Sequence, residues 1–334
     1  MRIVLDAMGS DHAPSVDVAG GVNAVRRFGH TVILVGQPEA VHAELQRLDT
    51  DGLPIEFVAA SEVIGMDEHP AQAARSKSNS SMVVGMGLLQ RGEADAFVSM
   101  GNSGGVLSSA LLSVNRIGRI KGVKRPAIST VVPTLEGLTF MLDIGANTDC
   151  RPEWLAQFAV MGSVYSNKVL GVENPRVALL ANGEEDIKGN KLVQEAWPLL
   201  QDLDINFVGN AEGKDITAGI ADVIVSDGFV GNVAVKTAEG TAKMLLTTLK
   251  REIKARPLAM AGALLARGAF SATAKLLDYR EYGGAPLLGV NGVVIIGHGR
   301  SDALAVENAV GLAANAVQSD LIAKVSEGIA ATLS

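Results

Sequence analysis

Five loops of the chain carry Gly beside Asn or His, and each follows or adjoins a short apolar run. Asn side chains and free backbone N–H groups are neutral hydrogen-bond donors, and donors that converge in a partly dry cleft suit an oxyanion. A single loop of this kind would mean little, because Gly and Asn are common turn residues. Their recurrence at predicted strand ends indicates a shared anion site formed by Gly101-Asn102, Gly145-Ala146-Asn147, Asn182-Gly183, Gly231-Asn232 and Gly297-His298-Gly299.

The third loop belongs to the stretch best suited to phosphate, residues 177–192. An apolar run ends at Asn182-Gly183, and a second turn, Lys188-Gly189-Asn190, leads into a helical pattern. The N–H groups of a helix N-terminus attract anions, and glycine lets a ligand approach closely. Lys188 adds a positive charge with three donors. The alternative is an ordinary strand–loop–helix turn with a solvated lysine.

A serine hydrolase is one alternative function. Residues 101–105 read Gly-Asn-Ser-Gly-Gly and match the G-x-S-x-G nucleophile elbow, in a strand-to-helix context. Asp227 and His298 follow Ser103 in the hydrolase order. The match is weak, because loops of small residues produce it by chance. A phosphate-ligand binding protein without catalysis is a further alternative.

Several cofactor and metal sites find no support in the sequence. The G-x-G-x-x-G fingerprint is absent, and Gly213-Lys214 lacks the leading glycine of a P-loop. The five histidines show no metal-ligand spacing, and no aspartate cluster suggests the metal site of an isocitrate-type dehydrogenase. We therefore expect no cofactor and no metal. The single Cys150 excludes an internal disulfide.

Composition indicates a globular α/β protein. Hydrophobic residues make up 48% of the 334 residues and charged residues 19%, while 37 glycines suit a sheet with many tight loops. The net charge of −7 argues against a nucleic-acid partner. The first residues read as a strand and not as a signal peptide. No apolar run reaches the roughly 18 residues that span a bilayer, so a cytoplasmic location is expected.

Strands alternate with helices along the chain, which predicts a doubly wound α/β fold with a mostly parallel sheet. We expect one domain over residues 1–334, with an apolar helical segment at about 252–280. The polar, Ser-rich residues 61–82 are expected to form a loop over a site. Residues 94–101 echo residues 221–228, which suggests either two ordinary strand–loop units or two loops that face one cleft. The predicted strands are 2–6, 31–35, 55–59, 96–100, 127–132, 138–144, 177–181, 205–208, 223–226 and 293–297.

Six blocks of the sequence together resemble the bacterial phosphate acyltransferases of phospholipid synthesis, also called acyl-ACP:phosphate transacylases. The resemblance covers nearly the whole chain. The family usually has Gly at the position of Ser10 and Thr at that of Ser103, and the turn at residues 185–188 differs in its middle. The matching blocks are residues 6–11, 99–104, 142–147, 182–190, 226–232 and 292–299.

The resemblance implies transfer of a long-chain acyl group from acyl carrier protein to inorganic phosphate, giving acyl-phosphate. It also implies a fold similar to phosphotransacetylase and isocitrate-type dehydrogenases, a homodimer, and peripheral contact with membrane lipid. We expect direct attack by phosphate without an acyl-enzyme on Ser103 or Cys150. The predicted catalytic residues are Lys188, His298 and Asp227, and the predicted substrate-binding residues are Asn102, Ser103, Gly104, Asn147, Asn182, Gly183, Gly189, Asn190, Gly231 and Asn232.

Two further segments suggest partners. Residues 116–125 hold five basic residues and no acid, which fits either a solvated loop or docking of an acidic carrier protein. Residues 257–266 carry no charge and are flanked by Lys and Arg. A run of this length suits a helix in the core or at a dimer contact, or an apolar tip that inserts shallowly among anionic headgroups.

Overall fold

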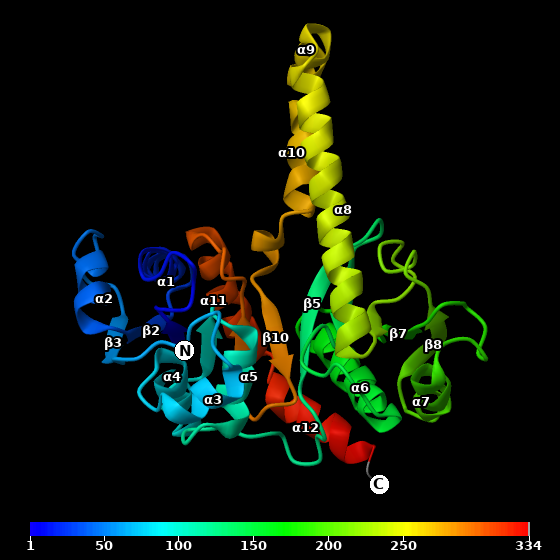
Figure 1. Cartoon of the computed structure of the whole chain (residues 1–334), viewed down its shortest axis with the longest axis horizontal. Helices are drawn as coiled ribbons and strands as arrows, with labels where there is room; N and C mark the ends of the chain where they lie inside the picture. The colour runs from blue at the N-terminus through cyan, green and yellow to red at the C-terminus, as the bar shows by residue number, and fades with distance from the viewer. Residues whose placement is uncertain (333–334) are drawn as a thin grey trace.

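Over residues 1–332, which the computed structural model describes, the chain folds around one sheet of eleven strands (Figure 1). The strand order is β3-β2-β1-β4-β11-β10-β5-β6-β9-β7-β8. The strands are β1 Arg2–Asp6, β2 Thr31–Gly36, β3 Ile55–Ala59, β4 Ala96–Ser99, β5 Ala127–Pro133, β6 Leu138–Leu142, β7 Arg176–Leu180, β8 Asn206–Ala211, β9 Val223–Val225, β10 Ala285–Leu288 and β11 Val293–Ile296. The helices are α1 Ser15–Phe28, α2 Pro38–Leu45, α3 Pro70–Ser76, α4 Ser81–Gln90, α5 Ser103–Leu112, α6 Pro152–Lys168, α7 Lys191–Gln201, α8 Gly228–Lys254, α9 Pro257–Leu265, α10 Arg267–Leu276, α11 Ala303–Gln318 and α12 Leu321–Ala331, with a 3-10 turn at Tyr279–Tyr282.

Most neighbouring strands are parallel, as predicted, but the centre of the sheet is antiparallel. The antiparallel pairs are β11–β10, β10–β5 and β5–β6. Strand β11 and its parallel neighbours β4 and β1 therefore run opposite to β6, β9 and β7. The sequence prediction missed β10, which has four residues and follows two glycines. The loops after β4, β6, β9 and β11 nevertheless contribute Ser103, Gly145, Asn232 and His298 to one cavity, although these strands do not all run in the same direction.

Helices cover both faces of the sheet because successive strand residues point to opposite faces. In β1, Ile3 and Leu5 join a core cluster with α1, α6, α11 and α12, whereas Val4 joins one with α3, α4 and α5. All three side chains are fully buried. A sheet that is buried on both faces accounts for the nearly continuous apolar runs of its strands.

The Ser-rich passage at residues 61–82 is not the predicted loop, because it contains α3 and the start of α4. Ser80 caps α4, and its Oγ accepts a hydrogen bond from the Val83 N–H at 3.4 Å. Met82, Val83 and Met86 of α4 are buried. The polar residues thus provide a turn and a helix cap, and only their composition suggests a loop.

The apolar segment forms a helical hairpin that projects from the body. Figure 1 shows α8 leaving the sheet, α9 at the tip and α10 returning beside α8. No described residue of α9 or α10 is buried in this chain. Of the alternatives for residues 257–266, packing in the core of this chain is therefore excluded. Within residues 1–332 no helix combines the length and the apolar composition that crossing a bilayer requires.

The direction of α8 depends on a close contact at its first turn. The buried carboxylate of Asp143 accepts hydrogen bonds from the main-chain N–H groups of Gly145, Ala146 and Asn147 at 3.1, 3.0 and 2.7 Å, which shapes the loop after β6. A Cβ atom added at Gly231 would lie 2.0 Å from the main-chain oxygen of Asp143. Only glycine therefore allows α8 to rest on the end of β6.

We predict that Gly231→Ala lowers the free energy of unfolding by about 1 to 3 kcal/mol, because α8 must move away from Asp143. Gly240→Ala in the same helix is the matched control, since a Cβ there meets no atom within 4 Å. The control should stabilise the protein by up to about 1 kcal/mol through helix propensity. Chemical denaturation of both variants measures the difference, and equal effects would contradict the proposed contact.

Candidate active site

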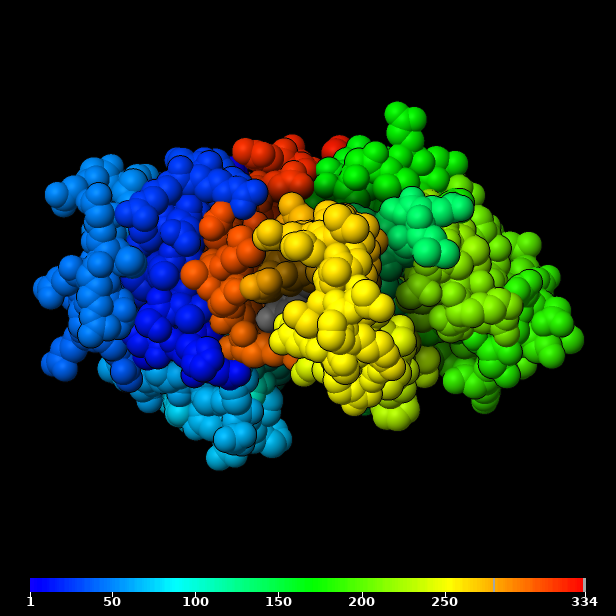
Figure 2. Space-filling model, turned by 90° about the horizontal axis from the view of Figure 1, so that it is seen from above, coloured from blue at the N-terminus to red at the C-terminus, as the bar shows by residue number. Residues whose placement is uncertain are grey.

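A cavity of about 390 Å³ lies where α8 crosses the centre of the sheet. Figure 2, seen from above, shows the yellow and orange hairpin over the middle of the molecule, between the blue N-terminal part and the green part. Side chains of β5 and α8 give the cavity an apolar wall. This wall includes Ile128, Val131, Val132, Val235, Ala238 and Ala242.

The cavity lining also includes polar and charged side chains. His298, Lys236 and Glu239 line it together with Ser103 and Asn232. The Lys236 Nζ lies 3.0 and 3.3 Å from the two carboxylate oxygens of Glu239. The His298 Nε2 lies 3.8 Å from Glu239 Oε1. One cavity therefore joins an apolar surface to a cluster of ionisable groups.

The imidazole of His298 favours its neutral form. Burial lowers the pKa of His298 below its ordinary value, the positive charges of Lys236 and Arg300 lower it further, and Glu239 opposes the shift. A neutral imidazole has one donor and one acceptor nitrogen. His298 can therefore accept or pass on a proton near neutral pH.

Two buried carboxylates support the loops on the other side of His298. Asp6 accepts hydrogen bonds from Ser99 Oγ at 2.7 Å and from the Met8 N–H at 3.0 Å, while Asp17 accepts one from Ser10 Oγ at 2.7 Å. The Oδ1 atom of Asp17 is buried without a hydrogen-bond partner among the described residues. Burial raises the pKa of Asp17 to about 7, and the nearby Asp6 adds to this rise. Both acids lie beneath the loop after β1.

That loop is tied to the loop of His298, because the Asp11 N–H donates to the Gly299 carbonyl at 2.7 Å. The carboxyl ends of β1, β4 and β11 lie side by side in the sheet. Packing between the loops is close, since a Cβ added at Gly9 would lie 2.8 Å from the Gly101 nitrogen. Asp6 and Asp17 therefore help to fix the loop after β1, which in turn contacts the loop of His298.

We predict that the wild-type protein loses stability as the pH rises from about 4 to about 7 through Asp17. The pKa of Asp17 is raised from 3.8 to about 7, so the folded state holds a proton that the unfolded state has lost. Because ionising Asp17 costs more free energy in the folded than in the unfolded state, the free energy of unfolding falls by up to about 4 kcal/mol across this interval. Asp17→Asn cannot ionise and should lack the loss. Denaturation curves of both proteins over this pH range test it, and parallel profiles would exclude Asp17 as the cause.

The residues predicted after β4 divide between the cavity and structural roles. Ser103 lines the cavity. Asn102 caps α5, because its Oδ1 accepts from the Gly105 N–H at 3.1 Å, and its Nδ2 donates to the Met66 carbonyl at 3.1 Å. Gly104 packs near Pro70, where a Cβ would lie 2.8 Å from the proline ring.

Of the substrate-binding residues predicted after β6 and β9, one lines the cavity and the others have structural roles. Asn232 lines the cavity, and its Nδ2 donates to the Ile144 carbonyl at 2.9 Å. Gly231 makes the close contact with Asp143 described above. The Nδ2 of Asn147 donates to the Pro126 carbonyl at 2.7 Å and to Asp143 at 2.9 Å, so this amide holds the loop.

Asp227 caps α8, because its Oδ1 accepts from the N–H groups of Phe229 and Val230, each at 2.9 Å. It follows β9, which is four strand positions from β11. Asp227 is not among the described residues that line the cavity, whereas Ser103 and His298 both line it. The carboxylate near His298 is that of Glu239. The structure therefore does not bring Ser103, Asp227 and His298 together as a triad.

The loop after β7 lies outside the described lining of the cavity. Asn182 Oδ1 accepts from the Gly189 N–H at 2.8 Å, and Asn190 caps α7 by accepting from the Val193 N–H at 3.0 Å. Lys188 is exposed, and its side chain packs against Gly183. Strand β7 lies two positions from β6, which is about 10 Å at the usual strand spacing.

Three comparisons with known proteins agree with one family. A family model described as "Fatty acid synthesis protein" matches residues 1–324. A phosphate acyltransferase of Desulfitobacterium hafniense is 49% identical over 328 residues, covering 98% of this chain and 97% of the relative. A phosphate acyltransferase of Heliobacterium modesticaldum is 50% identical over 330 residues, covering 98% of each chain. The chain belongs to the phosphate acyltransferase family. The resemblance found in the sequence is thus confirmed, and this member of the family is an acyltransferase whose reaction involves phosphate.

Solved structures confirm the predicted fold. A phosphotransacetylase of Streptococcus pyogenes aligns with a TM-score of 0.62 at 18% identity, over 96% of this chain and 94% of that chain. The EutD phosphotransacetylase of Staphylococcus aureus aligns with a TM-score of 0.60 at 18% identity, over 95% of this chain and 94% of that chain. At this identity the likeness concerns the fold.

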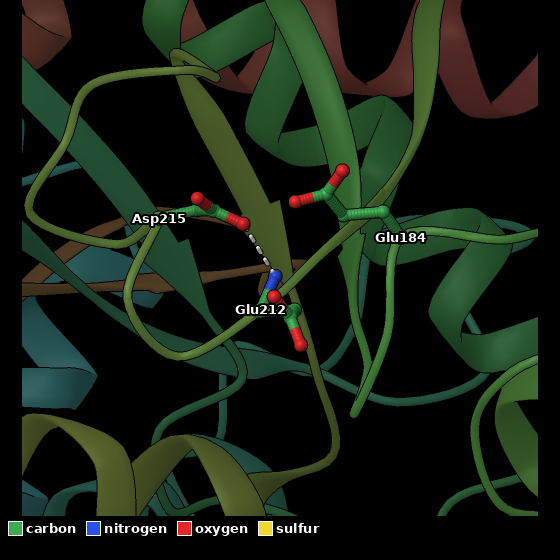
Figure 3. Close-up of side chains that lie close together, drawn as sticks. All are labelled: Glu184, Glu212 and Asp215. Carbon is green, nitrogen blue, oxygen red and sulfur yellow. Dashed lines mark hydrogen bonds between the residues drawn. The ribbon is translucent and has the colours of Figure 1, made fainter.

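Figure 3 shows an acidic group that the sequence prediction did not find, formed by Glu184, Glu212 and Asp215. The Glu212 N–H donates to Asp215 at 2.8 Å. Lys214 binds Glu184 at 3.0 Å and also contacts the Glu212 carboxylate. A lysine therefore already offsets part of this negative charge, and the group lies apart from the described cavity lining.

The site residues that sequence reasoning missed are Lys236, Glu239 and Arg300. Lys236 and Glu239 follow Asn232 by four and seven residues, which places all three on one face of α8. That spacing was the available signal. Cys150 was weighed as a nucleophile, but burial raises the pKa of its thiol to about 12, which opposes thiolate formation.

Proposed function

We propose that the protein transfers a long-chain fatty acyl group from acyl carrier protein to inorganic phosphate and releases acyl-phosphate. The observation that carries the proposal is the cavity beneath α8, whose lining joins an apolar wall to polar and ionisable side chains. The apolar wall suits the acyl chain, and the polar side chains suit phosphate and the reacting carbonyl. Family membership supports acyl transfer involving phosphate and does not support the serine hydrolase or a binding protein without catalysis.

The proposed reaction is direct. An oxygen of HPO₄²⁻ attacks the thioester carbonyl carbon, the carbon–sulfur bond breaks, and the phosphate proton ends on the carrier thiol. Phosphate is a competent nucleophile at neutral pH, so the protein mainly holds the reactants together and stabilises the oxyanion. Neutral His298 can relay the proton, while Ser103 and Asn232 can donate hydrogen bonds in the same cavity. A resident cofactor is not required.

Acyl carrier protein is the proposed donor partner, and the basic residues of segment 116–125 are its proposed docking surface. All five basic side chains are exposed in this chain. Arg125 also lies over the Trp154 ring at 5.0 Å, and Arg119 binds the Lys124 carbonyl. Three of the five, Arg116, Lys121 and Lys124, can therefore be changed with less risk to the loop.

The decisive assay measures acyl-phosphate formation from phosphate with a carrier-bound long-chain donor and with a small thioester analogue. Charge reversal at the three residues should raise KM for the carrier-bound donor about tenfold and leave the small donor unaffected, because carrier encounter depends on local charge. The control reverses three exposed basic residues elsewhere, Arg75, Lys168 and Lys191. Wild-type protein that forms no acyl-phosphate contradicts the proposed function, whereas equal effects on both donors contradict docking alone.

We also propose that the hairpin mediates peripheral membrane contact and a homodimer, with the protein otherwise in the cytoplasm. At the tip, Leu258 and Leu265 are each 90% exposed and Leu264 is 72% exposed. Basic residues at 250, 251, 254, 256 and 267 flank this tip. Such a tip suits shallow insertion among anionic lipids. Exposed Met244, Leu245 and Leu249 on α8 suit pairing with a second copy.

We predict that Leu264→Glu abolishes sedimentation with anionic liposomes, because a charge at the tip opposes insertion. Activity in solution and the melting temperature should change little, since Leu264 is exposed in this chain. Leu135→Glu is the matched control, because Leu135 is 90% exposed and lies in the loop between β5 and β6. A variant that becomes monomeric by gel filtration would instead assign the tip to the dimer contact.

A further inference from the structure

One carboxylate in the cavity is surrounded by basic side chains from two distant parts of the chain. Glu239 of α8 lies beside Lys236 one turn earlier, and the pair is joined at 3.0 Å. His298 and Arg300, from the loop after β11, approach the same carboxylate at 3.8 and 3.9 Å. Three basic groups thus lie within 4.0 Å of the Glu239 carboxylate.

The approach of His298 and Arg300 is too long for direct hydrogen bonds to Glu239, since those bonds fall below about 3.2 Å. The side chains of Glu239, His298, Lys236 and Arg300 keep 33, 41, 51 and 55% of their surface exposed. They can therefore exchange contacts with a solute. Lys236 and Arg300 each carry a positive charge whether or not His298 is protonated.

We propose that inorganic phosphate binds between Lys236, His298 and Arg300, in competition with the Glu239 carboxylate. The inference rests on the proposed function, which makes phosphate the acyl acceptor. Arginine binds phosphate oxygens in a bidentate manner, and a phosphate dianion attracts these groups more strongly than a carboxylate. Ser103, Gly297 and His298 line the same cavity as the apolar residues of β5 and α8, so bound phosphate would lie in the cavity that holds the acyl chain.

This placement differs from the one predicted from the sequence, where Lys188 and the loop 182–190 bind the anion. Lys188 and Arg300 are both exposed and both lie outside the described cavity lining, but Arg300 lies 3.9 Å from Glu239, which lines the cavity, whereas Lys188 follows β7. Phosphate held there would lie on the far side of β9 from the β6 loop. The two sites therefore predict different effects of substitution at Arg300 and at Lys188.

The first test measures the Kd of inorganic phosphate for the whole protein without acyl donor, by calorimetry. Arg300→Gln and Lys236→Met should each weaken binding about tenfold or more, because each removes a charge-assisted hydrogen bond. Lys243→Met, an exposed lysine of α8, is the matched control and should leave the Kd unchanged. A loss of affinity in Lys188→Ala with none in Arg300→Gln would overturn the inference in favour of the β7 loop.

Glu239→Gln supplies a test with the opposite sign. It removes the competing charge, so the phosphate Kd should fall several-fold, an outcome that a misfolded variant does not give. Weaker binding in Glu239→Gln would overturn the competition. In the acyl-transfer assay, an unchanged phosphate KM in Arg300→Gln overturns this site while the function stands. Phosphate binding that depends on Arg300, without any acyl-phosphate formed, would instead support the site and contradict the proposed function.

Discussion

The contact between the first turn of α8 and the main-chain oxygen of Asp143 determines where the site can form. The buried Asp143 carboxylate organises the loop after β6, and Gly231 lets the helix rest directly on that loop. Asn232 then donates to the Ile144 carbonyl and holds the helix in place. From this point α8 passes over β5, covers the cavity and continues into the hairpin (Figure 1).

A similar arrangement of an aspartate and the loop after it occurs in both halves of the sheet, at the ends of β1 and β6. Asp6 ends β1 and accepts from the Met8 N–H, as Asp143 follows β6 and accepts from Gly145 and Ala146. In each unit a serine at the end of the neighbouring strand donates to the aspartate: Ser99 to the carboxylate of Asp6, and Ser226 to the main-chain oxygen of Asp143. The sequence echo between residues 94–101 and 221–228 therefore reflects two equivalent units that support loops around one cavity.

One helix links the chemistry to the surface. The first half of α8 supplies Asn232, Lys236 and Glu239 to the cavity, and its second half carries the exposed apolar residues of the hairpin. The segment that returns from α10 contributes Leu277 and Tyr282 to the cavity lining. A long-chain acyl-phosphate is lipid-like, so the proposed function makes a continuous path from cavity to apolar tip physically useful.

Sequence patterns alone determined the strands, the loops and the family, because these signals are local. Apolar runs located ten of the eleven strands in the described chain, and the blocks around Gly101, Gly145 and Gly231 indicated the family. The four-residue β10 gave no such signal, yet it lies between β11 and β5 in the sheet, and the antiparallel pair β5–β6 then reverses the strand direction. The sequence prediction missed Lys236 and Glu239, and their helical spacing could not have shown that His298 and Arg300 lie near them. Only the tertiary structure brings these groups together and leaves Lys188 outside the described lining, because strand direction and helix position depend on contacts between residues far apart in the chain.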